Sequence, residues 1–241
     1  MVIRYRYDAG AFDRELTAAG AGQLTVLAAL AGTLGMHGVG WLAGLLFMLT
    51  VGLLTGLCGA AARAAAAGPA NRVTLARGTL VGGVTALVAD GLVHGGLYGA
   101  RLLVLVVIAS VALSLDLVDG WVARRTNSVS ELGARLDMEL DALLILVLSV
   151  LVAVSLGPWV LLIGLMRYLF VLAGSRYPWL VGPLPPSRAR KVVAAVQGVV
   201  LVAAMVPALP ASLPVAAVLG ALLSLLWSFG RDTLWLAAQT R

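Results

Sequence analysis

Six of the eleven acidic residues in this 241-residue chain lie between positions 116 and 141. Asp116 and Asp119 are three residues apart, and a helix that turns about 100° per residue places them on one face. Asp137 and Asp141 are four residues apart and share a face for the same reason. The eight residues 125–132 predict a short turn between two neighbouring antiparallel helices. We therefore expect the two acidic faces to meet.

Small residues lie among the aspartates on both predicted helices. Gly120 and Ala123 fall within about 40° of Asp116, and Gly133 precedes Asp137 by about one helical turn. Both faces therefore combine two carboxylates with at least one small residue. Helix capping explains one aspartate per helix, but it does not explain four aspartates with interleaved small residues.

The four carboxylates need a counter-charge. Converging carboxylates repel one another, and a single aspartate at the middle of a bilayer costs at least about 2.5 kcal/mol. Divalent cations offset both costs, and ligation by carboxylate oxygens suits Mg²⁺ or Mn²⁺. The spacing of Cys58, His37 and His94 does not indicate a zinc site. Asp90 and Arg101 are isolated in the sequence, and the pattern assigns them no role.

The complete pattern, D-x2-D-G-x2-A-R-x8-G-x3-D-x3-D, resembles the signature of the CDP-alcohol phosphatidyltransferase family. Its fixed positions are filled by Asp116, Asp119, Gly120, Ala123, Arg124, Gly133, Asp137 and Asp141. The resemblance implies a bundle of about six transmembrane helices, a centre of two metal ions and usually a homodimer. It also implies transfer of a phosphate-bearing group from a CDP-linked donor to an alcohol, with release of CMP.

The resemblance also assigns roles within this pattern. It makes Asp141 the general base that accepts the proton of the acceptor hydroxyl. The metal ligands that it implies are Asp116, Asp119, Asp137 and Asp141. The residues that it places beside the donor nucleotide are Gly120, Ala123, Arg124 and Gly133.

A second segment resembles the family about forty residues earlier. Residues 69–77 read P-A-N-R-V-T-L-A-R and resemble the short P-N-x-x-T-x-x-R segment before the first family helix, with Ala70 inserted. The resemblance places Asn71 and Thr74 at the nucleotide. Alternatively, Asn71 or Thr74 caps a helix whose arginines extend to the membrane surface.

The elements that position these residues are predicted to lie in a membrane. Hydrophobic residues make up 61% of the chain, charged residues 12%, and the mean hydropathy is +1.01. A soluble domain has about 25% charged residues, so the composition predicts an all-α, polytopic transmembrane bundle. Six family-type spans are expected, near 73–95, 101–124, 133–156, 159–177, 190–208 and 213–235. We expect two domains, an N-terminal segment of residues 1–68 with an extra transmembrane hairpin in 16–62, and a family domain of residues 69–241.

The charges predict the orientation of this bundle. Arginine and lysine gather in alternate breaks between the apolar segments, and the intervening breaks contain only Arg101. By the positive-inside rule, the basic breaks and the active site face the cytoplasm, as expected for an integral protein of a bacterial cytoplasmic membrane. The net charge of +6 therefore reflects topology and attraction to anionic membrane lipids, and no nucleic acid is expected as a partner.

Four basic residues are candidates for binding the acceptor: Arg167, Arg188, Arg190 and Lys191. Arg167 lies within an apolar segment, where an ionisable side chain is by default functional. It could instead bind the donor diphosphate or form a structural pair with an active-site aspartate. The three residues of 188–191 could equally anchor the chain at the cytoplasmic surface.

The function predicted from the sequence is metal-dependent transfer of a phosphatidyl group from CDP-diacylglycerol to an alcohol acceptor. One alternative within the family is a CDP-alcohol phosphotransferase that uses a soluble CDP-alcohol and diacylglycerol. A cation transporter is an alternative of another class, because transporters also place carboxylates within helices. Inositol phosphate, glycerol phosphate, serine and lipid alcohols all remain possible acceptors, since their specific contacts lie outside the motif.

Overall fold

The computed structural model describes residues 9–58, 62–63, 67–126, 130–182, 184–185, 187–206, 210 and 212–239. Over these ranges the structure has eight α-helices and no strand, which confirms the predicted all-α fold. The helices are α1 (Ala9–Leu34), α2 (Gly38–Gly56), α4 (Pro69–Val93), α5 (Gly99–Thr126), α6 (Glu131–Leu156), α7 (Leu161–Arg176), α8 (Arg188–Ala204) and α9 (Ser212–Gln239). Two short 3₁₀ turns, Pro158–Val160 and Pro178–Val181, flank α7.

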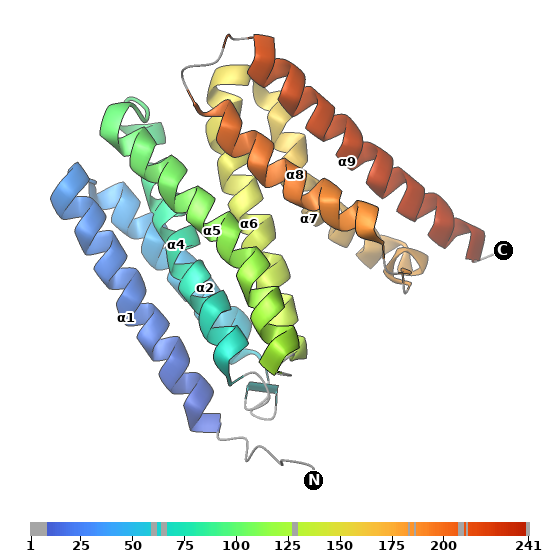
Figure 1. Cartoon of the computed structure of the whole chain (residues 1–241), viewed down its shortest axis with the longest axis horizontal. Coiled ribbons are helices and arrows are strands. Elements are labelled where there is room, and N and C mark those ends of the chain that lie inside the picture. Colours follow the sequence, from blue (N-terminus) through green and yellow to red (C-terminus); the bar gives the residue numbers. More distant parts are fainter. Residues whose placement is uncertain are drawn as a thin grey trace. The chain divides into compact units, whose positions relative to one another are not determined.

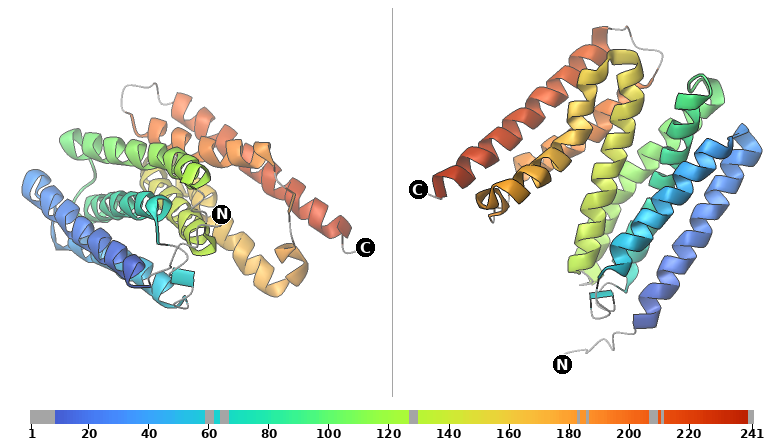
Figure 2. Two further views of the ribbon diagram at one scale, coloured as in Figure 1. Left: turned by 60° about the horizontal axis from the view of Figure 1, so that its bottom comes forward. Right: turned by 180° about the vertical axis from the view of Figure 1, so that it is seen from behind.

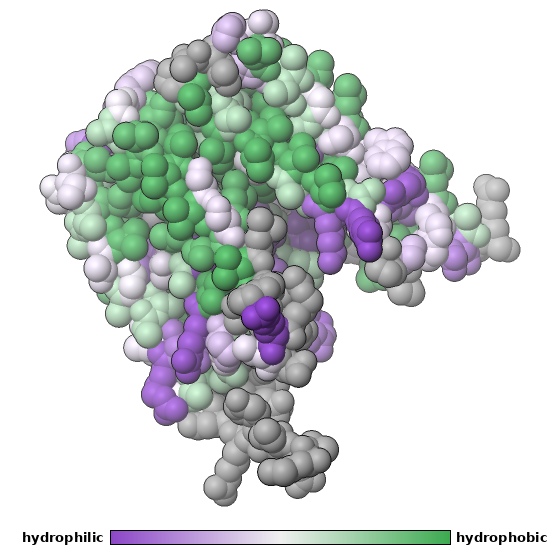
Figure 3. Space-filling model, in the orientation of Figure 1, coloured by the Kyte–Doolittle hydropathy of each residue, from purple (hydrophilic) through white to green (hydrophobic). Residues whose placement is uncertain are grey.

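Seven helical segments in the described part of the chain are long and apolar enough to cross a membrane. Every α-helix except α8, which has 17 residues, contributes one of them. The protein is therefore an integral membrane protein. The face shown in Figure 3 is mostly hydrophobic, as expected for helices that contact lipid. Leu42, Leu49 and Leu53 on α2, for example, are each more than half exposed.

The turn between α5 and α6 is shorter than predicted. Helix α5 continues to Thr126 and α6 begins at Glu131, so the predicted eight-residue turn loses residues at both ends. Arginine is a good helix former, which lets α5 extend beyond its apolar segment. At the other side, the Ser130 hydroxyl accepts a hydrogen bond from the Gly133 N–H at 3.0 Å and caps the first turn of α6.

The chain forms two compact units, residues 1–144 and residues 145–241. In the first unit, α4 packs against α1, α2 and α5, and these helices run side by side in Figures 1 and 2. Val81, Val84 and Leu87 on α4 are almost completely buried. Helix α4 is therefore the centre of this unit, and polar side chains that it carries are held inside.

The N-terminal hairpin α1–α2 has its turn at residues 35–37, within the stretch expected from the sequence. Small residues let it approach α4 closely: a Cβ on Gly83 would lie 2.9 Å from a methyl group of Val26 on α1. The Arg72 guanidinium of α4 also donates to the Glu15 carboxylate of α1 at 2.7 Å. The hairpin thus packs within the first compact unit, and the division of the chain at residues 68 and 69 stays a prediction.

The second unit contains α7, α8 and α9, with α8 packed against α9. The buried Gln197 amide of α8 donates to the Ala221 carbonyl oxygen of α9 at 3.1 Å. The Arg190 guanidinium donates to the Asp232 carboxylate of α9, also at 3.1 Å. Polar contacts therefore join these two helices near both the start and the middle of α8.

Candidate active site

A buried arginine on α4 is the centre of the candidate active site. Arg77 has no exposed surface. One terminal nitrogen, Nη1, donates to the Asp116 carboxylate of α5 at 2.5 Å. The other, Nη2, donates to the carboxylate and the backbone carbonyl of Asp137 on α6, at 2.5 and 3.1 Å. It also lies 3.4 Å from the Asp141 carboxylate. One side chain therefore links three helices.

The acidic faces of α5 and α6 meet around this guanidinium. Asp116, Asp137 and Asp141 each offer a carboxylate oxygen, and these oxygens lie within 4.8 Å of one another. Their side chains are 33%, 33% and 44% exposed. Arg77 thus contacts these carboxylates on their buried side, and their exposed side is accessible to a ligand.

This donor set fits a hard divalent cation. Three ionised carboxylates and one guanidinium carry a net charge of −2, which one divalent cation balances. Carboxylate oxygens are the ligands that Mg²⁺ and Mn²⁺ prefer. The arrangement therefore has both the charge and the ligand chemistry of the predicted metal centre.

Several predicted site residues lie on α5 where the structure describes only the backbone. Asp119, Gly120, Ala123 and Arg124 belong to the last turns of this helix, and their side chains are outside the described part of the chain. Their roles stay predictions. Gly133, at the start of α6, has a structural reason to be glycine, because a Cβ there would lie 2.8 Å from the Ser130 hydroxyl that caps the helix.

The predicted nucleotide residues Asn71 and Thr74 lie on α4, in the two turns before Arg77, and are only 3% and 5% exposed. Thr74 donates to the Ala70 carbonyl at 3.2 Å. Neither side-chain atom of the Asn71 amide has a hydrogen-bond partner among the residues that the structure describes. A buried amide without partners is costly, so this side chain is suited to a polar ligand. Neither residue is the Ncap of α4, which is Gly68.

Sequence analysis did not assign Arg77 to the site. The signal was present, because Arg77 is the final arginine of the P-N-x-x-T-x-x-R segment. The motif alone does not show that this arginine reaches the aspartates, which lie about forty residues further along the chain. The structure instead buries it against the aspartates.

The four candidate acceptor residues belong to the second unit. Arg167 is half-buried on α7, and Arg188 and Lys191 are exposed on the first turn of α8. Arg190 is already engaged by Asp232 and by the Pro185 carbonyl, to which it donates at 2.6 Å. Acceptor binding by all four residues stays a prediction.

Comparison with known families identifies the class of protein. The family model described as CDP-alcohol phosphatidyltransferase matches residues 67–227, about two thirds of the chain. The chain belongs to the CDP-alcohol phosphatidyltransferase family, and it is an enzyme of phospholipid synthesis rather than a transporter. Neither curated proteins nor solved structures match the chain. The family match begins two residues before α4 and leaves the α1–α2 hairpin outside it.

Proposed function

We propose that the protein transfers a phosphatidyl group from CDP-diacylglycerol to an alcohol acceptor and releases CMP. The observation that carries this proposal is the meeting of Asp116, Asp137 and Asp141 around Arg77 in a chain of this family. A CDP-linked donor bears a pyrophosphate, and its cleavage accumulates negative charge on the leaving phosphate. The site supplies carboxylates for cations and a fixed guanidinium within the same few ångströms.

Asp116, Asp119 and Asp137, together with Asp141, hold two divalent cations in this proposal. When bound, these cations stabilise the attacking and leaving oxygens of the displacement. Arg77 fixes the carboxylates of Asp116 and Asp137 through two separate nitrogens. It thereby keeps α5 and α6 at the separation that the ligand set requires.

Asp141 accepts the proton of the acceptor hydroxyl. Its carboxylate is the most exposed of the three and the most distant from Arg77, at 3.4 Å. Its greater exposure places this carboxylate at the side from which an acceptor alcohol can approach. The acceptor oxygen gains negative charge as it loses this proton and attacks the phosphorus atom. The base must therefore lie beside the acceptor oxygen in the site.

The buried Asn71 amide and Thr74 recognise the nucleotide together with Gly120, Ala123, Arg124 and Gly133. An amide presents both donors and an acceptor, which suits a cytosine edge or a ribose hydroxyl. Arg124 can bind a phosphate through its planar fork. Arg167, Arg188, Arg190 and Lys191 are proposed to receive the acceptor, whose identity the fold does not specify. We also propose that the enzyme is a homodimer, which cross-linking in native membranes tests.

The proposal is tested by incubating the purified protein with Mg²⁺, CDP-diacylglycerol and a panel of alcohols. We expect CMP release that depends on one class of acceptor, with a matching phospholipid in the mass spectrum. A second arm supplies CDP-choline and diacylglycerol. Turnover confined to that arm would replace the proposed donor with a soluble CDP-alcohol, and CMP release by neither arm would contradict the proposal.

A further inference from the structure

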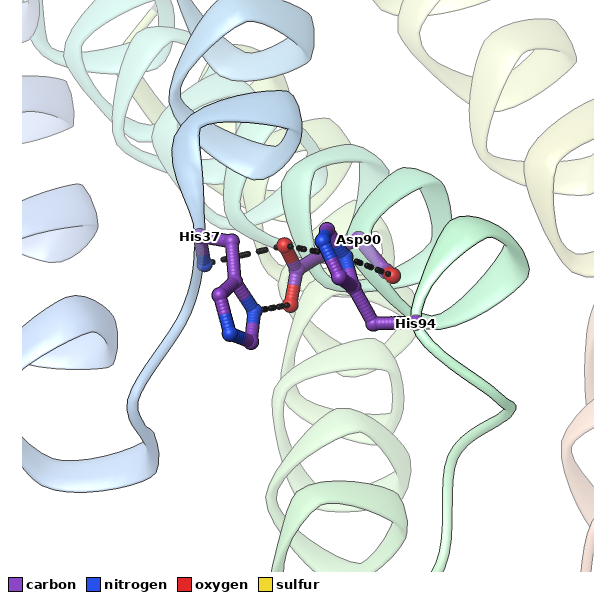
Figure 4. A group of neighbouring side chains, drawn as sticks. All are labelled: His37, Asp90 and His94. Atoms are coloured by element: carbon purple, nitrogen blue, oxygen red, sulfur yellow. Dashed lines mark hydrogen bonds and ion pairs between the residues drawn. The ribbon is translucent and has the colours of Figure 1, made fainter.

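Two histidines and an aspartate from separate segments meet at the end of α4 that lies away from Arg77. Asp90 is in the last turn of α4, His94 follows that helix, and His37 precedes α2. The Asp90 side chain is 1% exposed, whereas His37 and His94 are 54% and 32% exposed. Figure 4 shows both imidazole rings beside the Asp90 carboxylate. The sequence intervals between these residues do not indicate this cluster, because it is the packing of the helices that brings the three side chains together.

The distances between these ligand atoms match a tetrahedral ion. The Nδ1 atom of His94 lies 3.3 Å from one Asp90 oxygen, and the Nδ1 atom of His37 lies 3.4 Å from the other. One atom from each of the three residues falls within 4.8 Å of the others. Ligands at zinc distances of about 2.0–2.1 Å in a tetrahedron are separated by about 3.4 Å. The three residues thus bring ligand atoms to separations close to those around one Zn²⁺ ion.

The Asp90 carboxylate is oriented by contacts that leave ligand positions available. The His37 backbone N–H donates to Oδ1 at 2.9 Å, and the Arg101 guanidinium donates to Oδ2 at 3.2 Å. A carboxylate has about four lone-pair positions, so each oxygen retains one beyond these contacts. Arg101 is itself held by the backbone carbonyls of Leu34 and Gly35, at 3.0 and 2.6 Å. Such fixed partners orient a ligating carboxylate.

We propose that His37, Asp90 and His94 form a zinc site that fastens the N-terminal hairpin to α4. Imidazole nitrogens with one carboxylate favour Zn²⁺, whereas carboxylates alone favour Mg²⁺, so the two clusters of this unit select different ions. Asp90 is the thirteenth residue after Arg77 on α4, which is about 20 Å along the helix. The zinc site is therefore separate from the catalytic centre, and three protein ligands leave one position for water.

Zinc binding requires two local changes. The His94 Nδ1 atom lies 3.0 Å from the Asp90 carbonyl oxygen, a contact in which Nδ1 carries the proton, and the ion replaces that proton. The two rings are stacked, with centroids 4.0 Å apart and planes inclined by 18°. They must splay so that both Nδ1 atoms point at one ion. More than half of the His37 side chain is exposed, which leaves room for this rotation.

The test uses the full-length protein in detergent, purified without a polyhistidine tag and freed of metal by a chelator. The chain has two histidines, and both are in the cluster. Zinc stoichiometry is measured by equilibrium dialysis, and histidine reactivity with diethyl pyrocarbonate is followed by absorbance. We expect one Zn²⁺ to remain bound in Asp116→Asn/Asp137→Asn, where the catalytic carboxylates are neutral. His37→Gln/His94→Gln should lower the affinity of this ion at least about 10-fold.

The wild-type protein supplies a readout that does not depend on the folding of any variant. Stoichiometric Zn²⁺ should protect both histidines from modification, whereas Mg²⁺ should not. Histidines that react equally with and without Zn²⁺ would overturn the proposal. So would a zinc affinity that is unchanged in His37→Gln/His94→Gln, because the ion would then be bound elsewhere.

Discussion

The buried guanidinium of Arg77 offsets part of the negative charge of the aspartates in the candidate active site. It touches Asp116 and Asp137 through different nitrogens, so the fork shape of arginine matters as well as its charge. Removing a partner from such a buried group is costly, because the remaining charge is uncompensated. A bound cation supplies part of the same compensation. We therefore infer that Arg77 and the proposed metal ions support the carboxylates jointly.

This shared role predicts how Arg77→Lys behaves. A single ammonium cannot bridge the Asp116 and Asp137 carboxylates as two nitrogens do, so we expect the thermal unfolding midpoint to fall by about 5 °C without metal. Mg²⁺ should narrow the difference from wild type, because the cation then neutralises the carboxylates. Unfolding of the detergent-solubilised protein is measured with and without Mg²⁺.

Arg72→Lys is the matched control for this experiment. Arg72 is on the same helix and pairs with Glu15, but its side chain is 70% exposed, and exposed pairs contribute about 0–1 kcal/mol. Its small midpoint shift should not respond to Mg²⁺. If the Arg77→Lys difference is equally large at all Mg²⁺ concentrations, Arg77 is a structural anchor that does not share the carboxylates with the metal.

Asp137→Asn tests the metal ligands directly. The amide is nearly isosteric but carries no charge, so we expect CMP release to fall about 10²–10³-fold and the Mg²⁺ concentration for half-maximal activity to rise. Glu139→Gln on the same helix is the control and should retain activity near that of wild type. An unchanged Mg²⁺ dependence in Asp137→Asn would remove this residue from the proposed ligand set.

Residues on one helix, or on two helices joined by a short turn, could be predicted to act together, whereas residues on helices that meet only through tertiary packing could not. The meeting of Asp116, Asp137 and Asp141 follows from helical spacing and a short turn, both of which are local properties. The contacts of Arg77 with the aspartates and of His37 with Asp90 depend on how α2, α5 and α6 pack on α4. The spacing of residues along the sequence does not reveal that packing. Asp90 and Arg101 looked isolated for this reason.

At the scale of elements, α4 joins the two ends of the first unit. It carries Asn71, Thr74 and Arg77 toward one end and Asp90 at the other, all of them buried. Between these ends its glycines let α1 approach, because helices in a membrane associate through close packing and polar contacts rather than through the hydrophobic effect. The hairpin outside the family match thus packs directly on the helix that carries the site.

Gly83→Val should weaken this packing without touching the aspartates. The added Cβ would lie 2.9 Å from Val26, and a β-branched neighbour cannot rotate away easily. We expect a loss of about 1–3 kcal/mol, the usual cost of overpacking, measured by denaturation in mixed micelles. Gly32→Val on α1 is the control, since nothing lies within 4 Å of its added Cβ. Equal losses in the two variants would mean that helix propensity, not packing, sets the cost.

The helices themselves were largely predictable. The lengths of the apolar segments predict the number and order of the described helices. The glycines around residues 35–37 predict the turn between the first two. Their ends were less predictable: α5 and α9 extend beyond the expected apolar segments to Thr126 and Gln239. Helix formers and caps determine where a helix stops, whereas hydropathy reports only the part that lies in lipid.

At the scale of the whole molecule, the distribution of charge predicts the orientation in the membrane. The aspartates of the candidate active site lie near the break with Arg124, Arg125 and Arg135, whereas the turn between α4 and α5 is followed by Arg101 alone. Arg101 is engaged by Asp90 and by two backbone carbonyls, so it contributes little free positive charge at that surface. The positive-inside rule therefore predicts that the active site faces the cytoplasm and that the proposed zinc site faces the opposite side of the membrane.

Two exposed positions test this orientation. Tyr98 lies in the turn before α5 and is 75% exposed, and the Glu131 side chain at the start of α6 is 83% exposed. Cys58 is the only cysteine, so Cys58→Ser gives a cysteine-free background for Tyr98→Cys and Glu131→Cys. A membrane-impermeant maleimide should label Tyr98→Cys in spheroplasts but Glu131→Cys only after permeabilisation. The reverse pattern would place the catalytic site outside, where a cytoplasmic CDP-linked donor could not reach it, and labelling of both positions in sealed spheroplasts would mean that α5 does not cross the membrane.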